Sequence, residues 1–186
     1  MCGRYYVDPD DPKIKKIVQA ALEKKQKEYQ QLSFKGGDIY PGSVVPVITA
    51  SGPVFMKWAF PASFPGAKDH INIRSETANK LKSFKASWQN KRCLIPASAY
   101  YEWQKLENKK IAYIFHLENQ SLFYLAALYS EENQGFAIVT RESTSQFSFI
   151  HPRMPVIIAP ALLDDWLFTS PSVVTEAVTV LSCKKL

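Results

Sequence analysis

Glycine and cysteine are scarce in this chain of 186 residues, which contains seven of the former and three of the latter. Because 12 prolines accompany so little glycine, we expect stiff turns rather than flexible ones. The cysteines are odd in number and none stands in a CxxC pair, which argues against a disulfide scaffold and a zinc knuckle. A Gly-rich phosphate loop, an HExxH motif and a GxSxG motif are also missing. We therefore expect no metal and no cofactor.

Long apolar runs are absent as well. No stretch approaches the ~20 residues that a membrane-spanning helix needs, and the first residues lack the apolar segment of a secretory signal. Together with the unpaired cysteines, these absences predict a cytoplasmic protein without a membrane partner.

Aromatic and basic residues, by contrast, are abundant. Phe, Tyr and Trp number 11, 9 and 4, and 23 lysines and arginines against 17 acidic residues give a net charge of +6. A basic surface rich in aromatic rings suits a polyanion, and stacking side chains suit unpaired bases in particular. Many small proteins are equally basic without touching nucleic acid, so composition by itself favours the plainer interpretation.

The length fits one domain, and neither a repeat nor a linker divides residues 1–186. An amphipathic helix is predicted within residues 8–30, where Pro12 takes the first helical position behind Asp11 as N-cap. Apolar residues recur there with the period of a helix, at Ile14, Ile17, Val18, Ala21 and Leu22.

Short strand-like runs make up most of the remaining chain. They cover residues 44–49, 54–60, 93–95, 100–103, 111–116, 122–128, 136–140, 154–158 and 173–181. Helical segments are expected between them near residues 76–88, 143–149 and 161–168. Because helices do not alternate regularly with the strands, we predict an α+β fold: a largely antiparallel sheet or open β-barrel flanked by short helices.

Four short stretches put reactive side chains where packing alone would not require them. They are MCGRY at the start, INIRSET around Asn72, RCLIPASAYYEW with Glu102 near its end, and HPRMPVII from His151. Each side chain also has a plain explanation. Asn72 could cap the helix near Ser75, Glu102 could pair with an arginine, and a lone histidine is more often structural than catalytic.

Together the same residues favour chemistry. Glu102 stands between Tyr101 and Trp103, and a carboxylate flanked by aromatic rings tends to be desolvated, which raises its pKa toward the acid–base range. Histidine already titrates in that range, and Cys2 supplies a nucleophile. The set therefore contains the groups that covalent catalysis needs.

In order and register, the four stretches resemble the signature blocks of the SRAP family, the SOS-response-associated peptidases, and they span residues 2–158. Members of that family act as sensors of abasic sites in single-stranded DNA. The resemblance implies the SRAP fold, single-stranded DNA carrying abasic sites as the partner, and a DNA-associated location in the cytoplasm. We expect the protein to act as a monomer.

The resemblance also explains the cysteine after the initiator methionine. In the family the methionine is removed, so that Cys2 carries both an α-amine and a thiol, with reference pKa values of about 7.7–8.0 and about 8.5. The amine can condense with the aldehyde of an opened abasic deoxyribose, and the thiol can then close a thiazolidine ring. The second step is intramolecular, where effective molarities reach the order of 10⁵ M. The expected product is a covalent DNA–protein crosslink that shields the lesion.

Family roles carry over to matching residues. Glu102 corresponds to the acid–base glutamate that assists sugar opening and proton transfer. His151 corresponds to the histidine that handles protons at the opened sugar, and Asn72 to the asparagine that holds the cysteine. The expected DNA-contacting residues are phosphate-binding arginines, stacking aromatics and two less characteristic positions: Arg4, Arg74, Arg153, Trp58, Phe60, Thr140 and Pro41. For Arg153, the weaker candidate among the arginines, the alternative is a supporting role within the site.

Three departures from the family pattern concern base stacking and the orientation of His151. Ala59 stands where the family usually has glycine, Phe64 where it has tryptophan, and Pro152 where it often has aspartate. None of them removes a residue that the covalent chemistry needs.

Two other functions stay open at this stage. One is an N-terminal-nucleophile cysteine peptidase or amidohydrolase, which would use the same Cys2 amine and thiol to cut amide bonds. The other is a single-strand-binding module that works through charge and stacking alone, and for it Cys2 would be dispensable.

Overall fold

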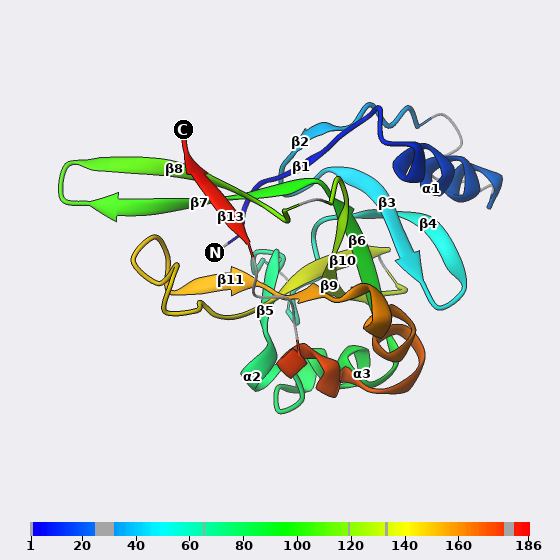
Figure 1. The fold of residues 1–186 in the computed structure, drawn as a ribbon. Coiled ribbons are helices and arrows are strands. Elements are labelled where there is room, and N and C mark those ends of the chain that lie inside the picture. The colour runs from blue at the N-terminus through cyan, green and yellow to red at the C-terminus, as the bar shows by residue number, and fades with distance from the viewer. Residues whose placement is uncertain (1, 25–31, 65, 119, 133, 177–180) are drawn as a thin grey trace.

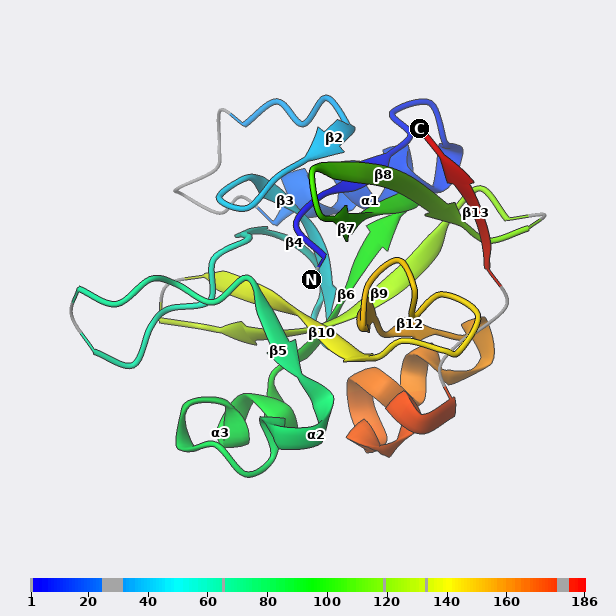
Figure 2. The same ribbon diagram turned by 90° about the vertical axis from the view of Figure 1, so that its left-hand side faces the viewer.

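A computed structural model describes residues 2–24, 32–64, 66–118, 120–132, 134–176 and 181–186, with strands at the centre and short helices outside (Figures 1 and 2). The strands are β1 (Tyr5–Val7), β2 (Gly37–Ile39), β3 (Val44–Thr49), β4 (Gly52–Lys57), β5 (Asn72–Arg74), β6 (Arg92–Ala97), β7 (Ala99–Leu106), β8 (Lys109–His116), β9 (Phe123–Ser130), β10 (Gly135–Glu142), β11 (Arg153–Pro155), β12 (Ile157–Ile158) and β13 (Ser182–Lys185). The helices are α1 (Pro12–Glu23), α2 (Ser75–Ala78), α3 (Lys82–Asn90) and the irregular η2 (Pro160–Leu162), η3 (Asp165–Thr169) and η4 (Pro171–Glu176).

The strands form two sheets. One has the order β13-β8-β7-β1-β2 and is antiparallel throughout. The other has the order β11-β10-β4-β3-β6-β9-β12, with β5 added beside β10. Only the pairings of β10 with β4 and with β5 are parallel within the described residues. The prediction of an α+β fold with largely antiparallel strands is confirmed.

In the second sheet the strands close into a ring, where the sequence analysis expected an open barrel or sheet. Strand β10 pairs with β9 on one side and with β4 on the other, through the register pair of Gly135 and Lys57. A Cβ atom at Gly135 would lie 2.2 Å from the carbonyl oxygen of Ala59. The closure therefore depends on a glycine that lets two backbones approach closely.

The ring separates two hydrophobic clusters. Along β10, Phe136 and Ile138 belong to the cluster shared with the first sheet, whereas Ala137 and Val139 belong to the cluster under α3 and η3. This alternation is the period of two that a strand buried on both faces requires. The first cluster also contains Cys2, so the beginning of the chain is part of the core.

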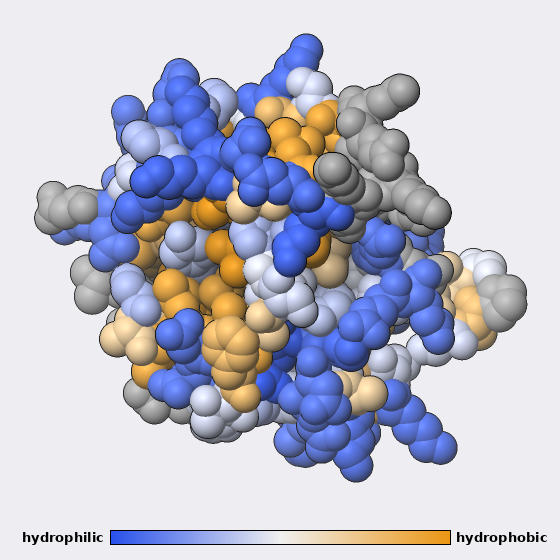
Figure 3. All heavy atoms as spheres, turned by 90° about the vertical axis from the view of Figure 1, so that its right-hand side faces the viewer, coloured by the Kyte–Doolittle hydropathy of each residue, from blue (hydrophilic) through white to orange (hydrophobic). Residues whose placement is uncertain are grey.

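Helix α1 begins as predicted, with Asp11 as N-cap and Pro12 at its first position. The Asp11 carboxylate accepts hydrogen bonds from the main-chain N–H of Lys13 at 2.7 Å and of Ile14 at 3.3 Å. It also accepts a hydrogen bond of 2.6 Å from the hydroxyl group of Ser121, which connects the helix to a distant loop. The helix packs on β3 and β4. Figure 3 views the molecule from this side, where hydrophilic side chains surround apolar patches.

Two predicted elements are wrong. Residues 143–149 form consecutive turns instead of a helix, with the N–H groups of Phe147 and Ser148 both bonded to the carbonyl of Thr144. Serine and threonine side chains compete for backbone partners there, as Ser148 does with the carbonyl of Ser145. Residues 173–176 of the strand predicted over 173–181 belong to η4 (Pro171–Glu176) instead, because Val173 packs into the cluster that contains Trp166. Residues 177–180 of that predicted strand lie outside the described residues, and Leu181 precedes β13 without being part of a strand.

Other predicted elements exist but are divided. The helix expected over 76–88 is broken between α2 and α3, and the helix expected over 161–168 is irregular in η2 and η3. The strand expected over 154–158 changes partner at Val156, because β11 pairs with β10 whereas β12 pairs with β9. These breaks depend on contacts between segments far apart in the chain.

The Asp11→Ala substitution should lower the free energy of unfolding by about 1–2 kcal/mol, because it removes the cap of α1 and the partner of Ser121. Burial alone would raise the pKa of Asp11, but its hydrogen bonds outweigh burial and lower it. The stabilisation is therefore present above the unfolded-state pKa of about 3.9 and is lost as the pH falls through the lower folded-state value. Urea unfolding at pH 7 measures the effect, and exposed Asp10→Ala is the control. An equal loss in both variants would contradict this role.

Candidate functional site

The position of Cys2 is fixed from β5. The side-chain amide of Asn72 donates a hydrogen bond of 2.8 Å to the carbonyl oxygen of Cys2, and the Cys2 side chain is fully buried. Asn72 is in turn held by β10, where it pairs with Ile138. The plain explanation of Asn72 as a helix cap does not apply, because Arg74 occupies the cap position of α2 and no side-chain cap bond is formed.

Glu102 lies in the part of β7 that enters the core, and only 3% of it is exposed. Burial raises its pKa to about 7, although the main-chain N–H of Trp103 favours the charged form. The carboxyl group therefore holds comparable protonated and ionised fractions at neutral pH. The arginines nearest in the signature stretches have other partners, since Arg4 pairs with Asp38 and Arg153 with Glu76.

The thiol of Cys2 is in the same desolvated environment. Burial raises its pKa well above the usual range, and the negative charge of Glu102 adds to the shift. The thiol is also a weak donor to the carbonyl oxygen of Arg4, which lies 3.9 Å from Sγ. The sulfur is thus protonated at neutral pH, and any bond that it forms requires a group that takes its proton.

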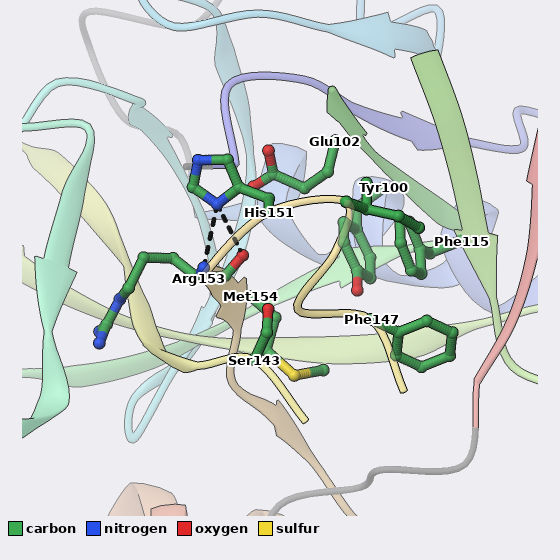
Figure 4. A pocket seen from close by; sticks show the side chains of 9 residues that line it. Tyr100, Glu102, Phe115, Ser143, Phe147, His151, Arg153 and Met154 are labelled. Atoms are coloured by element: carbon green, nitrogen blue, oxygen red, sulfur yellow. Dashed lines mark hydrogen bonds between the residues drawn. The ribbon is translucent and has the colours of Figure 1, made fainter. Parts of the chain in front are cut away.

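His151 lies beside Glu102, with its Nδ1 atom turned toward the backbone of Arg153 (Figure 4). Nδ1 is 3.0 Å from both the N–H and the carbonyl oxygen of Arg153. Burial lowers the pKa of His151, and the positive charges of Lys105 and Arg153 contribute in the same direction. The imidazole is therefore mainly neutral at pH 7, with Nδ1 committed to the protein backbone.

Arg153 supports this histidine and is not available for DNA in this structure. Its guanidinium binds both carboxylate oxygens of Glu76, at 2.7 and 2.9 Å, and also contacts the carbonyl oxygen of Thr140 at 2.7 Å. Such bidentate pairing fixes the position of the side chain. Arg153 therefore positions His151 through its backbone, which is the alternative expected for it besides a phosphate contact.

Three further residues expected to contact DNA are buried in this structure. Trp58 is fully buried, donates its indole N–H to the carbonyl of Ile71 at 2.8 Å, and stacks on Phe136. Phe60 packs edge-to-face on Phe84, and Thr140 is fully buried. These side chains form core, so in this structure they present no surface to a base or a phosphate.

Among the other expected DNA-contacting residues, Arg74 and Pro41 are exposed. Arg4 is held in a defined position: its guanidinium bonds Asp38 at 2.5 Å and lies 4.1 Å from the ring centroid of Tyr101. Phe64, which stands in place of the family tryptophan, is 68% exposed.

A cleft of about 300 Å³ opens beside the acid–base pair. It is lined by Glu102, Trp103, Lys105, Lys110 and His151. Sequence reasoning missed both lysines and the tryptophan. The sequence pattern that could have indicated two of them is the alternation of Tyr101, Trp103 and Lys105, which places the three side chains on one face of a strand.

Metal binding and membrane insertion find no support in the described part of the chain. No group of three or more His, Cys, Asp and Glu side chains gathers there in a way that could hold a metal ion. None of the helices described is long and apolar enough to cross a membrane.

Comparisons with known proteins identify the family of this chain. The family model described as SOS response associated peptidase (SRAP) matches residues 1–185. The abasic site processing protein YoaM of Bacillus subtilis is 38% identical over 117 residues, which are 55% of this chain and 52% of that protein. The abasic site processing protein YedK of Escherichia coli is 30% identical over 121 residues, 62% of this chain and 54% of that protein. The chain thus spans about half the length of the curated relatives that it matches.

The fold is also known from solved structures. A crystal structure of a protein from Bacteroides thetaiotaomicron superposes with a TM-score of 0.78 at 18% identity, covering 100% of this chain and 92% of the other. At that identity the likeness shows the fold alone.

An NMR titration of the His151 ring protons should give a pKa below 6.5, since burial and nearby cations disfavour the charged ring. Lys105→Gln should raise that pKa at low ionic strength, because one of those cations is removed. Lys85→Gln, on α3, makes the same change of charge elsewhere and should leave it unchanged. A His151 pKa at or above 6.5 in the unmodified protein would contradict this description of the site.

Proposed function

The chain belongs to the SOS response associated peptidase family, and we propose that it senses and shields abasic sites in single-stranded DNA by a covalent bond to Cys2. The main support is one observation: the backbone of Cys2 is held by Asn72 next to a buried carboxyl group, Glu102, whose pKa is about 7. The abasic site processing proteins among its relatives add support from similarity.

The proposed reaction begins after hydrolytic removal of Met1, which converts the Cys2 nitrogen from an amide into an amine. That amine attacks the aldehyde carbon of the opened deoxyribose, and the adduct loses water to give an imine. The Cys2 sulfur then adds to the imine carbon while its proton passes to the nitrogen. The product is a five-membered thiazolidine, and the net change is the loss of one water.

The pKa of the thiol supports the order of these steps. Burial and the charge of Glu102 raise the thiol pKa above the reference range of an α-amine, about 7.7–8.0. The amine therefore offers the larger nucleophilic fraction at neutral pH and attacks first. The thiol follows in an intramolecular step, where proximity compensates for its small thiolate fraction.

Glu102 can serve both proton transfers because its pKa is near neutrality. As a carboxylate it accepts the proton that the amine must lose, and as a carboxylic acid it donates to the departing hydroxyl group. A carboxyl group with an ordinary pKa of about 4.3 would rarely be available as the acid at pH 7.

His151 is proposed to exchange protons with the oxygen of the sugar. Its ring is mainly neutral, and Nδ1 is engaged by the backbone of Arg153, so Nε2 is the nitrogen that meets the sugar. Arg4 and Arg74 supply positive charge at the surface for the flanking phosphates. Arg153 and Glu76 act through His151 and are positioning residues.

The raised pKa of the Cys2 thiol argues against a cysteine amidohydrolase. Such an enzyme attacks with a thiolate and depends on a lowered thiol pKa, whereas burial raises that of Cys2. A module that only binds single strands would not need a buried carboxyl group poised at neutrality. Abasic-site crosslinking uses both features.

The first test incubates the mature protein, with its N-terminus verified by intact mass, with a single-stranded oligonucleotide that carries one abasic site. A band that survives denaturation should form with the unmodified protein and with Cys183→Ser, which removes a thiol outside the site. Cys2→Ala keeps a terminal amine, so it should give a band only after borohydride reduction of the imine. Glu102→Gln should slow formation about 100-fold.

Two results would overturn the proposal. One is the absence of any covalent band with the mature protein, and the other is a stable band in unreduced Cys2→Ala. Turnover of an amide substrate without crosslinking would favour the amidohydrolase instead.

The rate of crosslinking should also depend on pH in a specific way. It should rise between pH 6 and 8, because deprotonation of Glu102 near 7 creates the base and deprotonation of the amine creates the nucleophile. In Glu102→Gln the inflection near 7 should disappear while the amine inflection remains. Single-turnover rates across this range measure both, and an unchanged profile in the variant would exclude Glu102 as the titrating base.

A further inference from the structure

Two lysines face each other across the hairpin formed by β7 and β8. Lys105 and Lys110 are register partners, both are exposed, and both line the cleft that contains Glu102 and His151. Like charges directly opposite each other on antiparallel strands destabilise the pair. Such an arrangement becomes favourable when an anion lies between the two side chains.

Neither lysine takes part in an ion pair among the described residues. The ion pairs found there join Arg4 to Asp38, Lys15 to Asp10, Lys91 to Glu131 and Arg153 to Glu76. At the tip of the hairpin, the negative charge of Glu107 is offset by the positive charge of Lys109. The walls of the cleft therefore keep a surplus of positive charge on the hairpin side.

Aromatic rings lie on β7 between the two lysines and the core. Tyr101, Trp103 and Lys105 alternate along β7 and share one face of the strand. The ring centroids of Tyr101 and Trp103 are 6.4 Å apart, and the guanidinium of Arg4 lies over Tyr101. Arg4, Tyr101, Trp103, Lys105 and Lys110 thus form a row of cations and aromatic rings, which we call the hairpin track.

The hairpin track extends from the site along a hairpin that projects from the body of the molecule (Figure 1). Lys105 lies four residue steps along the strand from Tyr101, which corresponds to about 13 Å. Stacked nucleotides rise about 3.4 Å each along a strand, so this distance spans about four of them. The length suits a short segment of nucleic acid next to the lesion.

We propose that the hairpin track binds the single-stranded DNA that flanks the abasic site, with phosphates at Lys105 and Lys110 and a base stacked on Trp103. The proposal rests on the proposed function, because it lets the lesion enter the cleft at Glu102 and His151. Single strands are favoured over duplex because a half-buried indole can stack only on a base whose face is free.

Binding is tested without the covalent step by a labelled 15-nucleotide single strand carrying a tetrahydrofuran analogue, which has no aldehyde. The Lys105→Gln/Lys110→Gln variant should raise Kd at least tenfold at low salt. It should also flatten the slope of log K against log salt by about 1.4, since each lost phosphate contact on a single strand removes about 0.7. Trp103→Ala should raise Kd about tenfold and leave the slope unchanged.

The matched control is Lys82→Gln/Lys85→Gln, which makes the same change of charge on the exposed side of α3, away from the hairpin (Figure 1). Its Kd should remain within twofold of that of the unmodified protein. Its slope of log K against log salt should remain within 0.3 of the unmodified value. Circular dichroism and thermal unfolding of every variant confirm that the fold is retained. If the hairpin double variant behaves like the control, the hairpin track does not bind DNA.

The partner chemistry is tested by competition. Polyglutamate of equal charge should displace the oligonucleotide poorly, because it lacks bases to stack on Trp103. Equal displacement, together with a silent Trp103→Ala, would overturn the proposal in favour of an acidic polypeptide. Failure of the proposed function gives a different pattern: no covalent band with a true abasic site, while binding of the analogue still depends on Lys105 and Lys110.

Discussion

The hydrogen bond from Asn72 to the carbonyl oxygen of Cys2 is the contact on which the site depends. The beginning of a chain is normally mobile, and ordering each residue costs about 1–2 kcal/mol of backbone entropy. Here the Cys2 side chain is buried in the main hydrophobic cluster, and β1 is paired on both sides a few residues later. Residue 2 thus has a defined geometry because a side chain 70 residues away holds its backbone, in addition to the burial of its own side chain.

Desolvation then governs the electrostatics. Burial raises the pKa of Cys2 and of Glu102 and lowers that of His151, so in each case it favours the neutral form. The interior of the site therefore carries little charge of its own at pH 7. Positive charge gathers at the rim instead, at Lys105 and Lys110, where an anionic backbone can be held without desolvating the reacting groups.

The arginines of the signature stretches show how ion pairing assigns roles to similar residues. Arg153 is bound at both ends of its guanidinium by Glu76 and Thr140, so it acts as a support for His151. Arg4 is oriented by Asp38 and Tyr101 but remains at the surface. Arg74 is exposed. The sequence motif alone names all three as phosphate-binding candidates and leaves both roles open for Arg153.

Local sequence signals determined the elements that depend on neighbouring residues. The cap at Asp11 and Pro12 fixed the start of α1, and a short apolar run rich in β-branched residues located β3 with its observed bounds. The aromatic neighbours of Glu102 correctly indicated a desolvated carboxyl group with a raised pKa. The tertiary structure decided the features that depend on distant contacts: the ring closed at Gly135, the turns at residues 143–149, and the burial of Trp58 where a surface stack was expected. Periodicity reports which side chains share a face, whereas packing between distant segments decides whether that face meets solvent or another layer of the protein.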